Sequence, residues 1–149
     1  MKEIVFALEF KGNAAPVPGS ETRLRATTTA PGQTLRATFK PDGVQAAIEP
    51  AGGDAARFES EVEIVGDGQF LESGSIVYGS AGRVTFKTVG RGTLGPSPMP
   101  GVQRGAVVWE VTGGEGRFAG ATGLITSNFT VGEQGEVVDD QFARIFLSA

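Results

Sequence analysis

The sequence contains no cysteine and no histidine in its 149 residues. Without cysteine, the chain can form no disulfide, no zinc–thiolate site and no cysteine nucleophile. Without histidine, it can form neither a Ser-His-Asp triad nor an imidazole metal site. Any acid–base chemistry in this protein therefore has to come from Asp, Glu, Lys, Arg, Tyr or water.

Positive charge is also scarce, because 13 Lys and Arg stand against 17 Asp and Glu, which gives a net charge of −4. This balance argues against binding to nucleic acid, which requires a basic face, and against binding to an anionic membrane surface. No run reaches the roughly 18 apolar residues of a membrane span. Residues 1–12 alternate and carry charge, unlike a signal peptide, so we expect a cytoplasmic protein.

The 23 glycines and 8 prolines divide the chain into short runs in which apolar residues recur at every second position. Such a period of two marks a strand with one apolar face. The runs cover residues 4–10, 24–28, 34–39, 58–64, 70–78, 84–89, 106–112, 124–131 and 137–147. Their even spacing predicts roughly eight to ten antiparallel strands in one all-β domain over residues 1–149, as a barrel or a sandwich.

Two segments do not show this alternation. Residues 94–101, LGPSPMPG, contain three prolines, which are excluded from central strands. We expect residues 94–102 to form a loop that borders the mouth of a barrel. Residues 44–56 are ambiguous, and a helical turn is possible there.

Residues 113–123, GGEGRFAGATG, contain five glycines and have two interpretations. Gly114 to Ala119 fits the dinucleotide-binding pattern G-x-G-x-x-G/A, but that pattern holds a phosphate only where a helix follows. Residues 120–131 are typical of a strand instead. We therefore favour a turn whose glycines permit positive φ, with Gly120 and Gly123 relieving crowding where a strand bends.

Residues 107–123, VVWEVTGGEGRFAGATG, resemble the signature of the allene oxide cyclase-like barrels. This superfamily includes plant allene oxide cyclases, dirigent proteins and small bacterial cyclases of the spirotetronate-forming type. Residues 143–147, ARIFL, resemble the closing strand of those bacterial proteins, and the resemblance covers residues 106–147. It implies an eight-stranded, antiparallel, calycin-like barrel with a central apolar cavity, assembled into a dimer or trimer.

Enzymes of this superfamily fold or steer a reactive apolar substrate inside the barrel, generally without a metal or an organic cofactor. The resemblance therefore implies a cofactor-independent cyclase or isomerase that acts on a small apolar molecule. Two alternatives stay open. The barrel could bind a small molecule without catalysis, or it could be an oligomeric structural protein whose interior is filled by side chains.

The resemblance also places individual side chains in the cavity. Trp109, Ser127 and Phe129 fall at cavity-lining positions, and a looser alignment adds Glu72, where the superfamily has a tyrosine. Because interior and exterior residues alternate along barrel strands, further residues share these faces. The added substrate-binding candidates are Phe70, Ile76, Val107, Val111 and Ile125, and Tyr78 joins them on the strand of Glu72.

Glu72 and Tyr78 are the catalytic candidates. A carboxyl group among apolar side chains is desolvated, which raises its pKa and makes it a general acid or base near neutral pH. The Tyr78 hydroxyl would orient a substrate or polarise a carbonyl group. Alternatively, Glu72 lies in solvent at a strand end and Tyr78 only caps the core. The alternation leaves the side of Arg144 open, and Glu59, Glu61 and Glu63 are predicted to form a solvated face.

Overall fold

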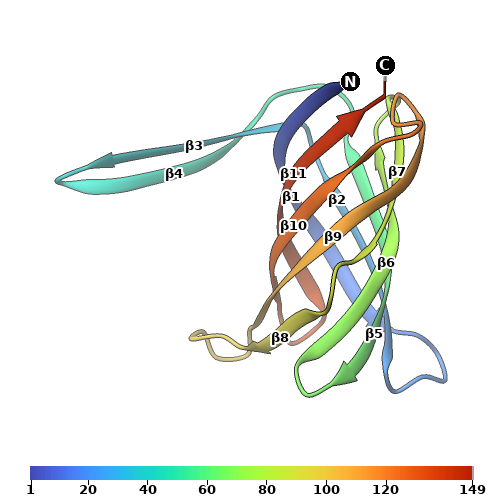
Figure 1. Ribbon diagram of the computed structural model, residues 1–149. Coiled ribbons are helices and arrows are strands. Elements are labelled where there is room, and N and C mark those ends of the chain that lie inside the picture. The colour runs from blue at the N-terminus through green and yellow to red at the C-terminus, as the bar shows by residue number, and fades with distance from the viewer. Residues whose placement is uncertain (149) are drawn as a thin grey trace.

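The computed structural model describes residues 1–148, and these residues form an all-β protein (Figure 1). The strands within this range are β1 (Lys2–Pro16), β2 (Arg23–Ala30), β3 (Gln33–Lys40), β4 (Gly43–Pro50), β5 (Ala56–Gly66), β6 (Gln69–Tyr78), β7 (Gly82–Thr88), β8 (Gly92–Pro96), β9 (Gln103–Gly116), β10 (Thr122–Val131) and β11 (Glu136–Leu147). None of residues 1–148 belongs to a helix that is long and apolar enough to cross a bilayer.

Eight of these strands close into an antiparallel barrel, one of the two architectures that the strand spacing predicts. Their order is β10-β11-β1-β2-β5-β6-β7-β9, and pairing of β9 with β10 closes the wall. Each of these strands therefore has a paired neighbour on both sides, although residues 2–10 of β1 pair with β11 alone. Both chain ends lie at one end of the barrel, and the turns β1–β2, β5–β6 and β10–β11 lie at the other (Figure 1).

The predicted alternation of inward and outward side chains is confirmed. On β6, Phe70, Glu72 and Ile76 are buried, whereas Leu71 and Val77 are exposed. On β9 and β10, the buried residues are Val107, Trp109, Val111, Ile125 and Ser127. The interior is therefore built from the predicted faces of these strands.

The half of the barrel nearer the chain ends is filled by side chains. The rings of Phe58, Phe86 and Trp109 pack against one another, with centroids 4.6 to 5.4 Å apart. Farther along, Tyr78 packs between Phe6 and Phe118, at centroid distances of 5.2 and 5.1 Å. These aromatic layers close the barrel at that end.

The glycine-rich segment is a turn, and no helix follows it. β9 ends at Gly116, Phe118 enters the core, and the chain returns directly as β10. Gly123 has φ +140°, and a Cβ there would clash with the carbonyl oxygen of Arg144 on β11. The close approach of two backbones, as the sequence predicts, explains this glycine.

For the irregular segments, one expectation is wrong and one ambiguity is resolved. Residues 94–96 are not loop but part of β8, a short strand that pairs with the start of β9. This is possible because the prolines lie at the end of β8 and in the following residues 97–102, where no central ladder is interrupted. Residues 43–50 form strand β4 and not a helical turn, since they pair along their whole length with β3.

β3 and β4 form a two-stranded hairpin that projects from the barrel, here called the arm (Figure 1). It leaves the barrel at the end that carries the chain termini. Most of its side chains are exposed on both faces. The sequence predicts a strand over residues 34–39 and leaves residues 44–56 ambiguous, and it does not predict that a hairpin leaves the barrel wall.

Candidate functional site

A cavity of about 520 Å³ lies inside the barrel at the end away from the chain termini. This volume lies within the range of small-molecule sites, about 300–1,000 Å³. Most of the lining is apolar and includes Leu24, Ile64, Phe70, Leu94 and Phe129. The aromatic layer that contains Phe58 and Trp109 forms its inner end.

Glu72 of β6 projects into this cavity and is 8% exposed. Its Oε2 accepts a hydrogen bond of 2.6 Å from Ser60 Oγ on β5. Its Oε1 accepts a hydrogen bond of 3.2 Å from Trp109 Nε1 on β9. Three strands therefore fix the orientation of this carboxyl group.

A second carboxyl group, that of Asp139 on β11, faces the same cavity and is 5% exposed. Its Oδ1 accepts a hydrogen bond of 2.5 Å from Ser127 Oγ on β10. Its Oδ2 accepts a hydrogen bond of 2.8 Å from Gln141 Nε2, two residues along the same strand. The cavity thus holds two buried acids, each oriented by two donors.

Burial raises the pKa values of both acids. Loss of hydration raises the pKa of Glu72 to about 7, and the negative charge of Asp139 adds to this effect. The hydrogen bonds from Ser60 and Trp109 act in the opposite direction. Burial likewise raises the pKa of Asp139 to about 6, against the hydrogen bonds from Gln141 and Ser127. Of the two acids, Asp139 therefore ionises at the lower pH.

No lysine or arginine among the described residues lines this cavity. The ion pairs of residues 1–148 lie on the outer surface, and none of them contains Glu72 or Asp139. A buried carboxylate without a cationic partner is costly. The two acids are therefore not a structural salt-bridge network.

Thr28 of β2 also lines the cavity and is 2% exposed. Within the described part of the chain, its hydroxyl oxygen has no hydrogen-bond partner. Buried hydroxyl groups in folded proteins nearly always have one, so an orphan of this kind needs an explanation. A bound molecule with a polar group would satisfy it.

The structure brings together half of the side chains that the sequence predicts for the site. Phe70, Glu72, Trp109, Ser127 and Phe129 line the cavity. The other five belong to the core or pack against it and do not line the cavity: Ile76, Tyr78, Val107, Val111 and Ile125.

Tyr78 shares a strand and a face with Glu72 but not a site. The two residues are six positions apart, which along a strand is about 20 Å. Tyr78 instead contacts Phe6 and Phe118 near the chain ends. Phase along a strand identifies the inner face of a barrel, but it does not tell how deep along the axis a residue lies.

The sequence-based site lacks Thr28, Ser60, Asp139 and Gln141. A signal for Asp139 and Gln141 exists in the sequence, because both share the inward phase of Val137, Ala143 and Ile145 on β11. The same signal exists for Thr28, which shares the inward phase of Ala26 and Ala30 on β2, and for Ser60, which shares that of Phe58 on β5.

Other predicted polar groups lie outside. Arg144 is exposed and pairs with Glu3 at 3.0 Å, which settles its side. Glu59, Glu61 and Glu63 are exposed, as predicted, and Glu61 pairs with Arg23. Residues 1–148 contain no group of three or more carboxylates that could hold a metal ion.

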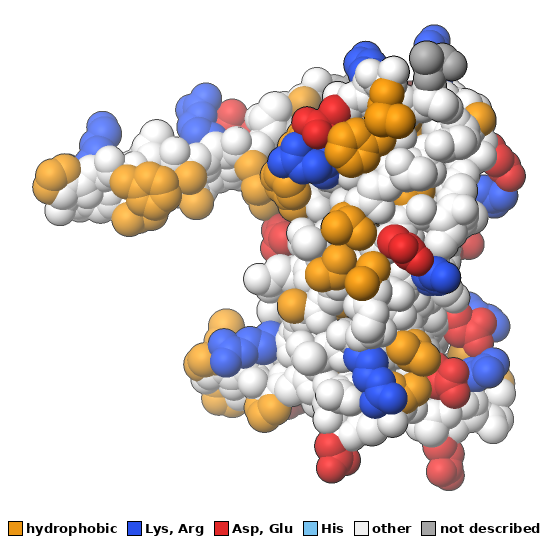
Figure 2. Space-filling view, in the orientation of Figure 1, with side chains coloured by type: hydrophobic (Ala, Val, Ile, Leu, Met, Phe, Trp, Pro, Cys, Tyr) orange, Lys and Arg blue, Asp and Glu red, His pale blue; other side chains and the backbone are white. Residues whose placement is uncertain are grey.

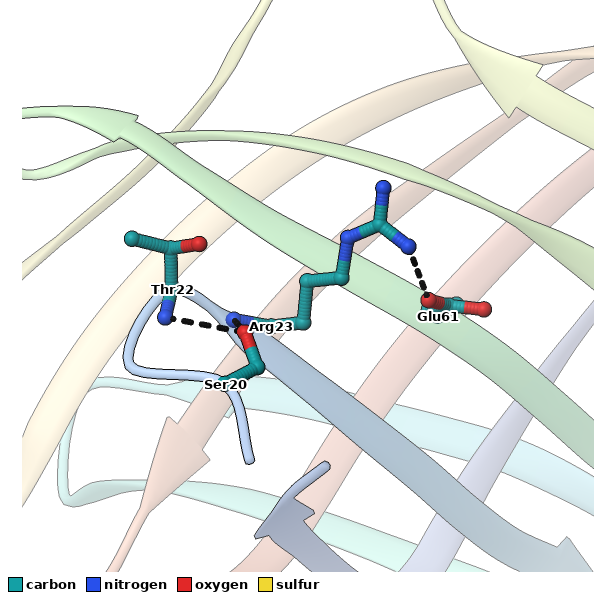
Figure 3. Close-up of polar contacts among 4 residues, drawn as sticks. All are labelled: Ser20, Thr22, Arg23 and Glu61. Atoms are coloured by element: carbon teal, nitrogen blue, oxygen red, sulfur yellow. Dashed lines mark hydrogen bonds and ion pairs between the residues drawn. The ribbon is translucent and has the colours of Figure 1, made fainter. Parts of the chain in front are cut away.

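The turn between β1 and β2 is held at the cavity end of the barrel (Figure 3). Ser20 Oγ accepts hydrogen bonds from the backbone nitrogens of Thr22 and Arg23, at 3.3 and 3.0 Å. The Arg23 guanidinium then bonds Glu61 on the neighbouring strand at 3.2 Å. These contacts fix the start of β2, whose next residue, Leu24, lines the cavity.

The chain matches no family model, no curated protein and no solved structure. The resemblance of residues 106–147 to the allene oxide cyclase-like barrels therefore stays a prediction. A barrel fold alone does not indicate an activity, so the function has to be argued from the cavity.

Proposed function

We propose that this protein binds a small lipophilic molecule in the barrel cavity and isomerises or cyclises it by proton transfer, without a cofactor. One observation carries the proposal: Glu72, with a pKa of about 7, stands in an apolar cavity of about 520 Å³. A group whose pKa lies near the working pH donates and accepts protons with similar ease.

The reaction needs no reagent beyond the substrate. Protonated Glu72 donates its proton to a carbonyl oxygen or an alkene carbon of the bound molecule. The resulting carboxylate then removes a proton from another position, so that the product is an isomer and Glu72 returns to its starting state. The apolar walls exclude water and hold the flexible chain in the shape that reacts.

The other polar groups have supporting roles in this proposal. Ser60 and Trp109 hold the Glu72 carboxyl group in place through their hydrogen bonds. Asp139 raises the pKa of Glu72 by its charge, which keeps part of the population protonated at neutral pH. Tyr78 has no part in this chemistry, because it lies in the packed half of the barrel.

The test has two stages, binding and turnover. N-phenyl-1-naphthylamine, a neutral fluorescent probe, should bind and quench the emission of Trp109, the single tryptophan of the chain. Turnover is then measured with β,γ-unsaturated cyclic ketones, whose conversion to the conjugated isomer is followed by ultraviolet absorbance. The parent should convert them, and Glu72→Gln should bind the probe normally but lose at least 100-fold in rate, the lower end of general acid–base effects.

Glu59→Gln is the matched control, because Glu59 lies on the outer face of β5 and is exposed. It should leave both binding and turnover unchanged. Probe binding without turnover in the parent would favour the rival function, a carrier that binds without catalysis. Absence of probe binding would refute both and leave the third possibility, a structural barrel.

A further inference from the structure

We infer that the molecule held in this cavity carries a cationic head group, an amine or another nitrogen cation, on its apolar body. This inference rests on the proposed function only in assuming that the cavity binds a small molecule. It comes from the polar groups of the lining and from the charge that the protein itself leaves unpaired.

The cavity lining is acidic and has no compensating base. Glu72 and Asp139 lie inside it, and Glu133, which is exposed in the β10–β11 turn, lies at its rim. Among residues 1–148, no lysine or arginine contributes to the lining. Such a surface attracts cations and repels anions, and low-dielectric walls strengthen the effect.

Asp139 is the group best placed to hold the cation. Ser127 and Gln141 each donate one hydrogen bond to a different oxygen of Asp139, so this carboxylate, which lines the cavity, keeps free acceptor positions. Both donors are neutral, so they orient the carboxylate but do not neutralise it. An ammonium group from the ligand would supply the missing counter-charge and up to three donors.

Thr28 is an independent indication of a polar ligand group. Its hydroxyl is buried and unsatisfied within the described chain, although it lies in the wall of the same cavity. A purely apolar molecule would leave this oxygen without a partner. A ligand with N–H donors would satisfy the Thr28 oxygen together with Asp139.

Three probes of equal chain length test the head group directly: octylamine, octanol and octanoate. Each competes with N-phenyl-1-naphthylamine at pH 7.5, where the amine is charged. We expect octylamine to bind at least tenfold more tightly than octanol, and octanoate to bind most weakly. Equal or tighter binding of octanol or octanoate would overturn the inference.

Asp139→Asn removes the charge but keeps the shape, and it should remove most of the preference for octylamine while octanol binds as before. Glu72→Gln provides a second variant should the first fail to fold, and it should weaken octylamine selectively. Asp140→Asn is the control, because Asp140 is the neighbouring exposed residue. Equal weakening of all three probes by Asp139→Asn would show a structural role and overturn the inference.

The outcomes separate this inference from the proposed function. If the fluorescent probe binds and ketones are isomerised but octylamine has no advantage, only the cationic head group is wrong. If the fluorescent probe does not bind at all, the cavity function itself fails.

A second inference comes from the arm. We infer that its apolar face packs on the outer barrel wall of a second copy of this chain, in a twofold dimer. Register places Leu35, Phe39, Val44 and Ile48 on one face of the hairpin, because Leu35 pairs with Ile48 and Phe39 with Val44. These four side chains are 37% to 75% exposed.

The apolar face of the arm needs a surface to pack against. An isolated two-stranded hairpin is at best marginally stable in water, and this one projects away from its own barrel (Figure 1). The opposite face of β3 carries Thr34, Arg36, Thr38 and Lys40, as expected for a face in solvent. Apolar alternation on one face only is the pattern of a strand pair that rests on a surface.

The barrel wall beside the arm offers a matching surface. A groove on the outer face of β9, β10 and β11 is lined by Val89, Val108 and Phe142, and Leu35 at the base of the arm borders it. Figure 2 shows apolar side chains both along the arm and on the wall next to it. In a twofold pair, each arm would lie on the wall of the other copy.

The area is sufficient for a specific dimer. Eight residues at about 3.3 Å each give a face about 26 Å long and, with two strands and their side chains, about 10 Å wide. Two arms on two walls cover about four such faces, on the order of 1,000 Å², which is the lower bound for a specific interface.

Light scattering at micromolar concentration measures the oligomeric state. The parent should be a dimer, and Phe39→Glu should be monomeric with an unchanged barrel spectrum. Thr38→Glu places the same charge one residue away on the opposite face, so it should stay dimeric. A monomeric or trimeric parent, or a dimer that survives Phe39→Glu, would overturn this inference.

Discussion

Trp109 Nε1 donates a hydrogen bond of 3.2 Å to Glu72 Oε1, so the aromatic layer of the core and the buried acid form one unit. The indole ring also packs on Phe86 and Phe58, which fixes the direction in which its N–H points. The part of the barrel that is filled by side chains thereby determines the geometry of the part that is open.

Replacing Trp109 with Phe removes this donor. We expect the pKa of Glu72 to rise above about 7, because the indole hydrogen bond holds it down. Stability should fall by about 1 kcal/mol or more, from the lost hydrogen bond and the smaller ring. Carboxyl carbon NMR measures the pKa, and chemical denaturation measures the stability. An unchanged Glu72 pKa would contradict the role given to Trp109.

Glu72→Gln tests the cost of the buried charge. The pKa of Glu72 is about 7 in the folded chain against an ordinary value of 4.5, so the unfolded chain loses this proton first as the pH rises. Stability is therefore full below pH 4.5 and falls until about pH 7, by about 3 kcal/mol. Glu72→Gln lacks this loss, so its advantage over the parent should grow between pH 4.5 and 7. A constant difference across thermal melts in this range would contradict the burial.

Asp139→Asn tests the electrostatic contact between the two acids. The charge of Asp139 raises the pKa of Glu72, so removing it should lower that pKa. Asn keeps an oxygen that accepts from Ser127 or Gln141, which preserves the local structure. Titration of Glu72 by NMR in both proteins measures the change, with Asp140→Asn as the surface control. If the pKa of Glu72 stays the same or rises, the charge of Asp139 does not act on the Glu72 carboxyl group.

Thr28→Val exchanges a buried, unsatisfied hydroxyl for a methyl group of similar size. We expect the ligand-free protein to gain about 1 kcal/mol or more, since a buried polar group without a partner is costly. The same change should weaken octylamine binding. Denaturation and probe competition measure the two effects. A loss of stability in the ligand-free protein would mean that this hydroxyl already has a partner.

Gly123→Ala tests the turn that leads into β10. The positive φ and the clash with the Arg144 carbonyl oxygen both oppose a Cβ at this position. We expect a loss of more than about 2 kcal/mol, beyond the ordinary effect of a surface substitution. Gly43→Ala is the control, since a Cβ there meets no atom within 4 Å, and it should change stability by less than about 0.5 kcal/mol. Equal melting temperatures of the two variants would contradict this reading of the turn.

The all-β class and the inward faces were predictable because their signal is local, whereas alternation alone left barrel and sandwich open. Alternation along β6, β9 and β10 identifies the inward side chains without any knowledge of the neighbouring strands, and Gly123 marks a close backbone approach. The inward position of Glu72 follows from the same phase. A strand alternates in this way whichever strand it pairs with. An error in the predicted topology therefore does not change which of its side chains share a face.

The errors arose where one local pattern, such as alternation or a proline, is compatible with two different structures. Residues 34–39 of β3 alternate as barrel strands do, and residues 44–56 were ambiguous, but β3 and β4 pair only with each other and leave the wall. β8 contains a proline and is still a strand, because it is short and pairs with β6 only through its first two residues and with the start of β9. The residues of a strand do not by themselves determine which strand it pairs with or where it lies in a sheet.

The sequence alone therefore determined the all-β class, the inner and outer faces, and the placement of one acid inside. Only the tertiary structure decided which inward residues meet. It separates Tyr78 from Glu72 along the barrel axis, and it brings Asp139 and Thr28, 111 residues apart in the chain, into one cavity with Glu72. The physical reason is that side-chain phase is a property of one strand, whereas depth along the axis depends on the stagger of all eight strands, which is fixed only when the barrel closes.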